Sequence, residues 1–223
     1  VSILNCVNYG KINATMSVGG IIGYSADNGE IKFCRNEGEV VSTGNNAGGI
    51  AGFLLADTLK IIKCLNLGNI TSEANYAAGI LGQVYQGNGA DALIYDCLNK
   101  GSVVGVNYVA GISMCTYNRS SYDTVVAHCL NEGTISGQSY VYGTAHISYG
   151  QCNNTVNTGS VSGTEYLYGT TNRFVAGYKN YFGGNCSQNM TETSGSIYSS
   201  TLVQDMQDSN WWQDQTVWSE PWD

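Results

Sequence analysis

Cysteine and histidine are the residue types in this chain with the clearest capacity for chemistry. Eight cysteines and two histidines, His128 and His146, are present among 223 residues. A zinc site built on cysteine normally contains a Cys-x-x-Cys pair, and no such pair occurs; the two histidines are also not at ligand spacing from one another. The sequence therefore predicts no zinc site and no bound cofactor.

Five of the cysteines recur at a single position of a repeated pattern. They are Cys6, Cys34, Cys64, Cys97 and Cys129. If successive copies stack as strands, neighbouring cysteines lie ~4.8 Å apart, inside the ~4.4–6.8 Å range of disulfides, but their Cα–Cβ bonds run parallel. We expect buried thiols that act as small hydrophobic groups. Cys152 is expected to fill an aliphatic column, and a disulfide among Cys115, Cys152 and Cys186 is the alternative.

Nucleophilic and carboxylate catalysis both lack the necessary groupings. A cysteine nucleophile needs a positioned base, and His128, the neighbour of Cys129, should point to the opposite face of its strand. Carbohydrate hydrolysis needs two carboxylates across one bond, yet Glu37 and Glu132 share a column only in non-adjacent copies. We expect a chain that is not an enzyme, with carbohydrate cleavage as the alternative.

Calcium is the one ion for which the loops offer ligands. Asp27, Asp91 and Asp123 lie in segments rich in Gly, Asn and Ser, and oxygen atoms of such segments can bind calcium. A solvated acidic loop has the same composition. We therefore predict no metal, with loop calcium as the alternative.

The elements that position these residues follow from one repeat. The unit Asn-x-Gly-x-[Ile/Val] occurs six times, and successive asparagines are 28, 30, 33, 32 and 26 residues apart. The repeated residues are Asn8, Asn36, Asn66, Asn99, Asn131 and Asn157, with Gly10, Gly38, Gly68, Gly101, Gly133 and Gly159. A second block, [Val/Ala]-Gly-Gly-Ile-x-Gly in its fullest form, begins eight or nine residues after the glycine. Self-similarity on this period is typical of a solenoid.

Each copy holds three apolar or β-branched runs without helical periodicity. We predict an all-β fold, a right-handed parallel β-helix (β-solenoid) of six turns with about three short strands each. The Asn is expected at a corner with positive φ, its amide bonded along the stack, and the Gly should make the tight turn. The Ile three residues before each Cys has the opposite strand parity, so both can face inward only across a bend or bulge.

The Cys-x-Asn-x-Gly-x-[Ile/Val] block followed by Gly-Gly-Ile-x-Gly resembles the GLUG-motif repeat proteins of bacterial surfaces. The end of the chain, with its Asp-Met, Val-Trp and Pro-Trp pairs, resembles the tail that closes such proteins. The resemblance implies an accessory part of surface proteins, adhesin-like chains or large secreted peptidases, without a catalytic role of its own. We accordingly expect a solenoid at 1–178 and a capping segment at 179–223. The capping residues are Trp211, Trp212, Trp218 and Trp222.

Composition narrows the class of partner. The net charge is −8, and only nine Lys and Arg are present, scattered singly, which argues against nucleic acid. No apolar run approaches the ~20 residues of a membrane span. The charged fraction of 12% is about half the usual value of roughly 25%. A surface built on Asn, Ser, Thr, Gly and Tyr is common in exported proteins, and we expect an extracellular or cell-surface location.

The longest insertions, at 83–93 and 114–124, fall at one point of the repeat, which places them on one edge of a solenoid. This edge is the expected contact surface, with Tyr85, Tyr117 and Tyr122, because tyrosine offers a flat ring with a polar tip. We predict a non-catalytic adhesive, structural or display module that binds a protein or glycan surface. A filament formed by end-to-end stacking and a carbohydrate-binding β-helix are the alternatives.

Overall fold

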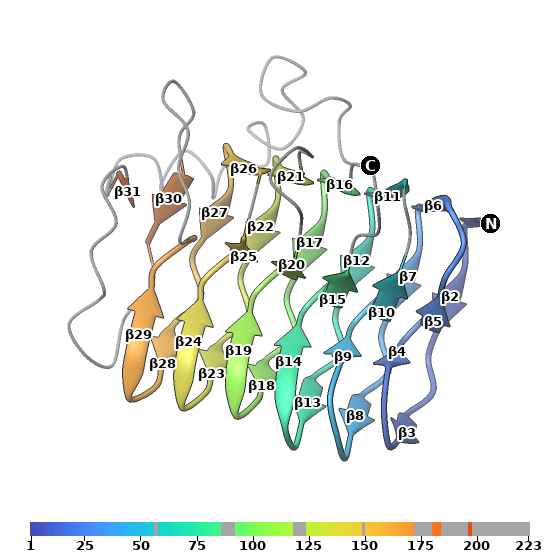
Figure 1. Cartoon of the computed structure of the whole chain (residues 1–223), viewed down its shortest axis with the longest axis horizontal. Coiled ribbons are helices and arrows are strands. Elements are labelled where there is room, and N and C mark those ends of the chain that lie inside the picture. The colour runs from blue at the N-terminus through green and yellow to red at the C-terminus, as the bar shows by residue number, and fades with distance from the viewer. Residues whose placement is uncertain are drawn as a thin grey trace.

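In a computed structural model the chain folds into turns that stack along one axis (Figure 1). The structure describes residues 1–55, 58–85, 92–117, 124–148, 150–171, 180–183 and 196–197. These residues form strands and no helix, and all their strand pairs are parallel, which confirms the predicted parallel β-solenoid. Within the same ranges no helix is long and apolar enough to cross a membrane.

Each complete turn contains five strands, where three were expected. The described residues form five complete turns and a sixth with four strands, in which Thr171 makes a single bridge to Ala145. Equivalent strands of successive turns pair side by side and form five sheets, called A to E in chain order. Identical residues stack in register; Ile31, for example, lies between Ile3 and Ile61.

Sheets A and B contain the Ile, Cys and Asn columns. Sheet A consists of β1 (Ser2–Leu4), β6 (Gly29–Lys32), β11 (Leu59–Ile62), β16 (Ala92–Tyr95), β21 (Thr124–Ala127) and β26 (Gly150–Asn153). Sheet B consists of β2 (Val7–Asn8), β7 (Arg35–Asn36), β12 (Leu65–Asn66), β17 (Leu98–Asn99), β22 (Leu130–Asn131), β27 (Val156–Asn157), β30 (Asn180–Phe182) and β31 (Ser196–Ile197). Sheet B thus continues into the expected capping segment.

Sheets C, D and E complete each turn. Sheet C consists of β3 (Ile12–Ala14), β8 (Val40–Ser42), β13 (Ile70–Ser72), β18 (Val103–Val104), β23 (Ile135–Ser136) and β28 (Val161–Ser162). Sheet D consists of β4 (Val18–Gly19), β9 (Ala47–Gly48), β14 (Asn75–Ala78), β19 (Asn107–Ala110), β24 (Ser139–Tyr142) and β29 (Glu165–Tyr168). Sheet E consists of β5 (Ile22–Ser25), β10 (Ala51–Leu55), β15 (Leu81–Tyr85), β20 (Ser113–Tyr117) and β25 (Ala145–Ile147).

Each turn has two left-handed residues, and the first of them separates two of the five strands. The first lies between sheets A and B, and its φ is between 50° and 55° at Asn5, Phe33, Lys63, Asp96, His128 and Asn154. The bend at Phe33 lets Ile31 and Cys34, which have opposite strand parity, both face the interior, where they are 3% and 1% exposed. This is the bend that the parity of the two columns required.

The repeat asparagines do not have the positive φ expected for them. Asn36, Asn66, Asn99 and Asn131 lie in strands of sheet B and their side chains are buried inside the solenoid. Each donates one Nδ2 hydrogen bond to the carbonyl of the next repeat glycine and one to Oδ1 of the asparagine in the following turn, at 2.7–2.9 Å. The predicted amide ladder is present. The positive φ occurs instead at the residue directly before the column cysteine, for example at Phe33 before Cys34.

The two largest of three hydrophobic clusters fill the interior, and the third, with Ala78, Ala110, Met114 and Tyr142, lies beside the tyrosines of sheet D. One core contains the Ile and Cys columns of sheets A and B together with sheet E, including Ile61, Ile80 and Cys97. The other contains the aliphatic columns of sheets C and D, including Ile70 and Val109. Between them, the asparagines pack directly on the second glycine of the Gly-Gly-Ile blocks, where a Cβ would overlap the amide.

The repeat glycines are required by close approach of neighbouring turns. All six lie at the bend between sheets B and C, where a turn was expected, and none of them has positive φ. A Cβ on Gly101 would overlap the carbonyl oxygen of Gly68 in the turn before, and the same holds along the column from Gly38 to Gly159. At Gly10, in the first turn, the nearest atom to such a Cβ is 3.8 Å away.

Candidate functional site

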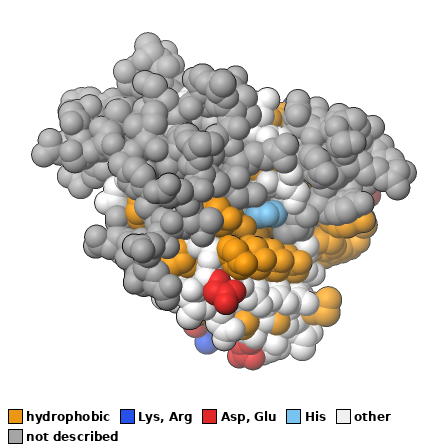
Figure 2. Space-filling model, turned by 60° about the vertical axis from the view of Figure 1, so that its left-hand side comes forward, with side chains coloured by type: hydrophobic (Ala, Val, Ile, Leu, Met, Phe, Trp, Pro, Cys, Tyr) orange, Lys and Arg blue, Asp and Glu red, His pale blue; other side chains and the backbone are white. Residues whose placement is uncertain are grey.

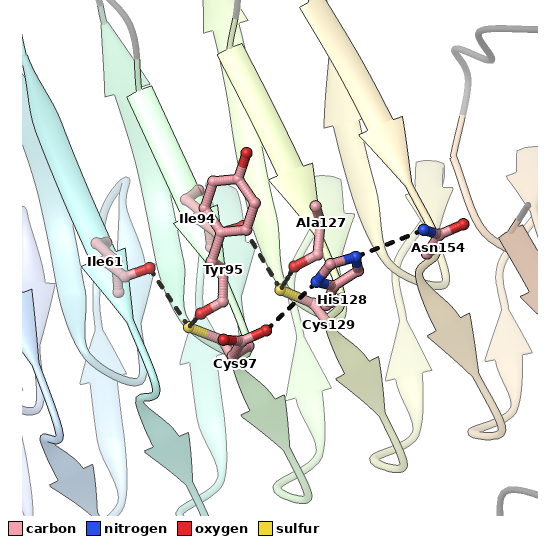
Figure 3. Close-up of polar contacts among 9 residues, drawn as sticks. Ile61, Ile94, Tyr95, Cys97, Ala127, His128, Cys129 and Asn154 are labelled. Atoms are coloured by element: carbon pink, nitrogen blue, oxygen red, sulfur yellow. Dashed lines mark hydrogen bonds and ion pairs between the residues drawn. The ribbon is translucent and has the colours of Figure 1, made fainter. Parts of the chain in front are cut away.

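The cysteine column is structural in the described turns. The Sγ of Cys97 lies 3.2 Å from the carbonyl oxygen of Tyr95 and 3.7 Å from that of Ile61, and Cys129 repeats this geometry one turn later (Figure 3). The thiols of Cys6, Cys34, Cys64, Cys97 and Cys129 are all unpaired. Burial raises the pKa of the Cys97 thiol. Cys34, Cys64, Cys97 and Cys129 are buried and act as inert packing groups, as predicted, whereas Cys6, in the first turn, is exposed.

The cysteines off this column are also unpaired where the structure describes them. Cys152 lies beside Val126 in the aliphatic column of sheet A, as predicted. Cys115 and Cys152 are free thiols, and burial raises the pKa of Cys115 to about 12. Cys186 lies outside the described residues. The alternative of a bridge between Cys115 and Cys152 is absent from this structure.

His128 lies at the left-handed bend between sheets A and B, next to Asn154 of the following turn (Figure 3). Its Nδ1 lies 3.5 Å from Oδ1 of the fully buried Asp96, and its Nε2 lies 3.4 Å from Nδ2 of Asn154. All three residues occupy the left-handed column between sheets A and B. They form a row of three polar side chains, one from each of three successive turns.

Metal-ligating and carboxylate groups do not converge in the described part of the chain. No group of three or more His, Cys, Asp or Glu side chains there is placed to hold a metal ion. Glu37 forms an ion pair with Arg35 and Glu132 with Lys100, in separate turns. Of the loop acids considered for calcium, Asp27 is exposed, whereas Asp91 and Asp123 lie outside the described residues.

The expected contact edge is only partly described. Tyr85 and Tyr117 are paired in register at the ends of β15 and β20, where sheet E leads into the connections to sheet A. Tyr85 is 41% exposed. Tyr122, together with the four capping tryptophans Trp211, Trp212, Trp218 and Trp222, lies outside the described residues, so their roles stay predictions.

A more regular tyrosine array lies on sheet D, where the sequence reasoning did not place a site. Tyr76, Tyr108, Tyr140 and Tyr166 occupy the second left-handed position of four consecutive turns, with φ between 54° and 64°. Their ring centroids are 5.2, 4.8 and 4.7 Å apart and the rings are nearly parallel. We call these four residues the tyrosine ladder. Each lies nine or ten residues after a repeat asparagine, a spacing that could have revealed the column.

A second aromatic cluster lies beside the tyrosine ladder. Tyr142 stacks on Tyr168 at 4.7 Å, and the ring of His146 lies 5.0 Å from Tyr142 and 6.3 Å from Tyr108. Burial lowers the pKa of His146 to about 4, so the ring is neutral at pH 7. A band of hydrophobic side chains, with a histidine and carboxylates beside it, is open on the face shown in Figure 2.

The stacking determines which atoms of the tyrosine ladder a partner can reach. The inner rings, Tyr108 and Tyr140, have a ring on both faces, so they present ring edges and hydroxyl groups. Tyr166, the last member, has Tyr140 on one face only and is 47% exposed. The array therefore offers a row of hydroxyl groups that ends in one open aromatic face, and flat stacking of a ligand is possible at that end.

No family model and no curated protein matches this chain. A solved chain shares its fold with a TM-score of 0.59 and 18% sequence identity, and is described as a putative immunoglobulin A1 protease from Bacteroides ovatus. The alignment covers 91% of this chain and 62% of that one, so this chain spans less than two thirds of the solved protein. At this identity the likeness shows a common β-solenoid fold.

The comparison corrects one expectation from the sequence. We expected a chain that is not an enzyme, because its repeat pattern places no catalytic grouping in view. The solved protein with this fold bears the name of a protease, which overturns that expectation. The reasoning failed because it treated the repeat as sufficient to exclude catalysis, whereas a fold does not determine function.

Proposed function

We propose that this chain is a rigid β-solenoid module of a secreted or cell-surface protein and that it has an adhesive or display role. Its contact surface is the face of sheet D that carries the tyrosine ladder, and its partner is a protein or glycan surface. The resemblance to GLUG-motif repeats agrees with this role, and membership of that family stays a prediction. The tyrosine edge at the ends of β15 and β20 is a second, smaller surface on the same scaffold.

The observation that supports this proposal is the choice of tyrosine at a left-handed position in four consecutive turns. A left-handed backbone is unfavourable for residues with a Cβ by roughly 1–2 kcal/mol, and Asn and Asp tolerate it best. The first two turns have Ser17 and Asn46 at this position, so the backbone accepts small polar residues there. Tyrosine in the next four turns is therefore selected for its ring. Strained positions of this kind are concentrated at functional sites.

The test replaces three members of the ladder with the residue that the second turn already uses. Tyr76→Asn, Tyr108→Asn and Tyr140→Asn are combined in one variant, and circular dichroism checks that the solenoid is retained. Native chain and variant are then immobilised and exposed to a panel of purified extracellular proteins and to a glycan array. We expect a partner that the native chain captures and the variant does not.

A matched control separates this surface from the edge predicted from the sequence. Tyr85→Asn changes one exposed tyrosine on sheet E and should leave capture unchanged. Loss of capture by Tyr85→Asn with full capture by the triple variant would move the contact surface to that edge. Capture by neither the native chain nor any variant would contradict an adhesive role.

Filament formation is a second candidate, supported by the first turn. There the Oδ1 of Asn8 accepts a hydrogen bond from Gly10 N at 3.1 Å, whereas the Oδ1 of Asn36 accepts from the asparagine of the turn before. Val7 is 45% exposed at the same edge. A further turn of the same repeat, supplied by a second copy or by the same protein, would extend the ladder.

The open space at Gly10 provides a specific block. Because a Cβ there meets no atom closer than 3.8 Å, Gly10→Val should leave the fold intact. The column from Gly38 onward shows that a stacked turn leaves no room for a side chain at this position. Electron microscopy across a concentration series should show filaments of the native chain that lengthen with concentration and single rods of the variant. Single rods of both at every concentration would contradict assembly.

A further inference from the structure

The last ring of the tyrosine ladder has an environment that the other three lack. Tyr166 is stacked on Tyr140 at 4.7 Å with an interplanar angle of 13°, and it is nevertheless 47% exposed. Among the described residues no second ring stacks on Tyr166, so its other face can contribute to this exposed area together with the ring edge and the hydroxyl group. Its chain neighbours Thr164 and Glu165 are also exposed. The end of the ladder therefore combines an open aromatic face with an accessible carboxylate.

Among the described strands of sheet D, the one charged side chain is the carboxylate of Glu165. None of the six strands of sheet D contains Lys or Arg, and the whole chain has a net charge of −8. Desolvation is the main cause that raises the pKa of Tyr140, and the Coulombic influence of Tyr166, Tyr108 and the Glu165 carboxylate adds to it. Glu165 pairs with Ser139, the chain neighbour of Tyr140, so it lies in the strand next to the ladder. A cationic group would meet attraction from both the carboxylate and the ring face.

We infer that Tyr166 and Glu165 form a binding site for an arginine side chain of a partner protein. A guanidinium group is planar and weakly hydrated, so it can lie flat on the open ring of Tyr166 while it donates hydrogen bonds to the Glu165 carboxylate. A lysine ammonium group is compact and strongly hydrated and cannot cover the ring in this way. This inference rests on the proposed function, because it specifies the partner chemistry of the tyrosine face.

The experiment titrates the full chain with two designed peptides. Each peptide has twelve residues, one with four Gly-Ser-Arg repeats and the other with Gly-Ser-Lys, and binding is followed by shifts of backbone amide signals at 50 mM NaCl. We expect the arginine peptide to bind about twofold to fivefold more tightly than the lysine peptide, as the strength of an exposed cation–π contact allows. The largest shifts should occur in β29.

Matched variants test the two proposed contacts. Tyr166→Asn removes the ring with the residue that Asn46 shows to fit this position, and Glu165→Gln removes the charge. Each should weaken binding of the arginine peptide by up to about fivefold. Glu39→Gln removes an exposed carboxylate on another face, paired with Lys11, and should have no effect. Unchanged amide signals in sheets A to C show that each variant is folded.

Three results would overturn the inference. They are equal affinity for the two peptides, equal weakening by Glu39→Gln and Glu165→Gln, and displacement of the arginine peptide by tetramethylammonium as readily as by free arginine. The first two indicate unspecific attraction to an acidic protein, and the third a site for quaternary ammonium groups. If the ladder variants lose their panel partner while the peptides show no arginine preference, only this inference fails. If the peptides behave as expected and no panel partner is found, the adhesive role fails.

Discussion

Replacing one amide in the middle of the asparagine ladder should be among the most damaging single changes in this chain. Asn99 is fully buried. Its Nδ2 donates to Gly101 O at 2.9 Å and to Asn131 Oδ1 at 2.7 Å, and its Oδ1 accepts from Asn66 Nδ2 at 2.8 Å. Asn99→Ala therefore leaves three buried polar groups without a partner.

The magnitude follows from these three groups. A buried polar group that loses its partner costs about 1–3 kcal/mol. Even at the lower limit the three sum to roughly 3 kcal/mol, and the cavity left by the amide adds to this. We expect Asn99→Ala to lower the free energy of unfolding by about 3–5 kcal/mol, a large part of the total of about 5–15 kcal/mol typical of a domain.

Asn8→Ala is the matched control. Asn8 makes the same two donations, to Gly10 O and Asn36 Oδ1 at 2.8 Å, but it lies in the first turn and is partly exposed. Water can replace the amide there, so the loss should be about 1 kcal/mol. Urea denaturation followed by circular dichroism measures both variants, and hydrogen exchange shows which turns are affected. Equal destabilisation by the two substitutions would refute the assigned role of the ladder.

Three further predictions follow from the interior and the aromatic cluster. Gly101→Ala should prevent stable folding while Gly10→Ala leaves the melting temperature unchanged, since only the first Cβ overlaps a neighbouring carbonyl. His146 has a pKa lowered to about 4 by burial against roughly 6.5 when unfolded, so the unfolded chain binds the extra proton between these values. Stability should therefore fall as the pH falls from about 6.5 to 4, by on the order of 2 kcal/mol after allowance for partial exposure, and His146→Gln should remove this component in urea titrations at each pH. Iodoacetamide should label Cys6 in the native chain and leave Cys97 unlabelled, as read by peptide mass spectrometry; labelling of both at the same rate would show that the column thiols are accessible.

The columns of buried residues were predictable because packing in the interior requires an apolar side chain at the same position of every turn. Ile31, Ile61 and Ile94 repeat in the sequence and stack in the structure because each turn buries the same position. The backbone between the columns was less predictable. Phe33 and Lys63 adopt φ of 55° and 51°, although neither residue type favours a left-handed conformation. The stacking of whole turns imposes the left-handed conformation at these positions, and it cannot be inferred from the residue types.

The tyrosine ladder was not predicted either, because its left-handed conformation is also not indicated by the residue type. At a left-handed position a sequence argument looks for Gly or Asn, so a tyrosine there is assigned to an ordinary strand. Asn46 satisfies the expectation, and Tyr76 and Tyr108, in the following turns, do not. The regular interval of nine or ten residues from the repeat asparagine was present in the sequence, but only alignment of all six copies on that asparagine makes it visible.

Comparison of the two left-handed columns shows which residue choices are required by the fold and which need another explanation. Along the first column the residue type changes at every turn, from Phe33 to Lys63, Asp96 and His128, while φ stays within a few degrees of 52°. The backbone conformation therefore places no demand on the side chain. Along the second column φ lies between 53° and 65°, and four turns in succession have tyrosine. Since the scaffold does not account for that uniformity, the cause must lie in the rings themselves, in their mutual stacking and in the surface that they present.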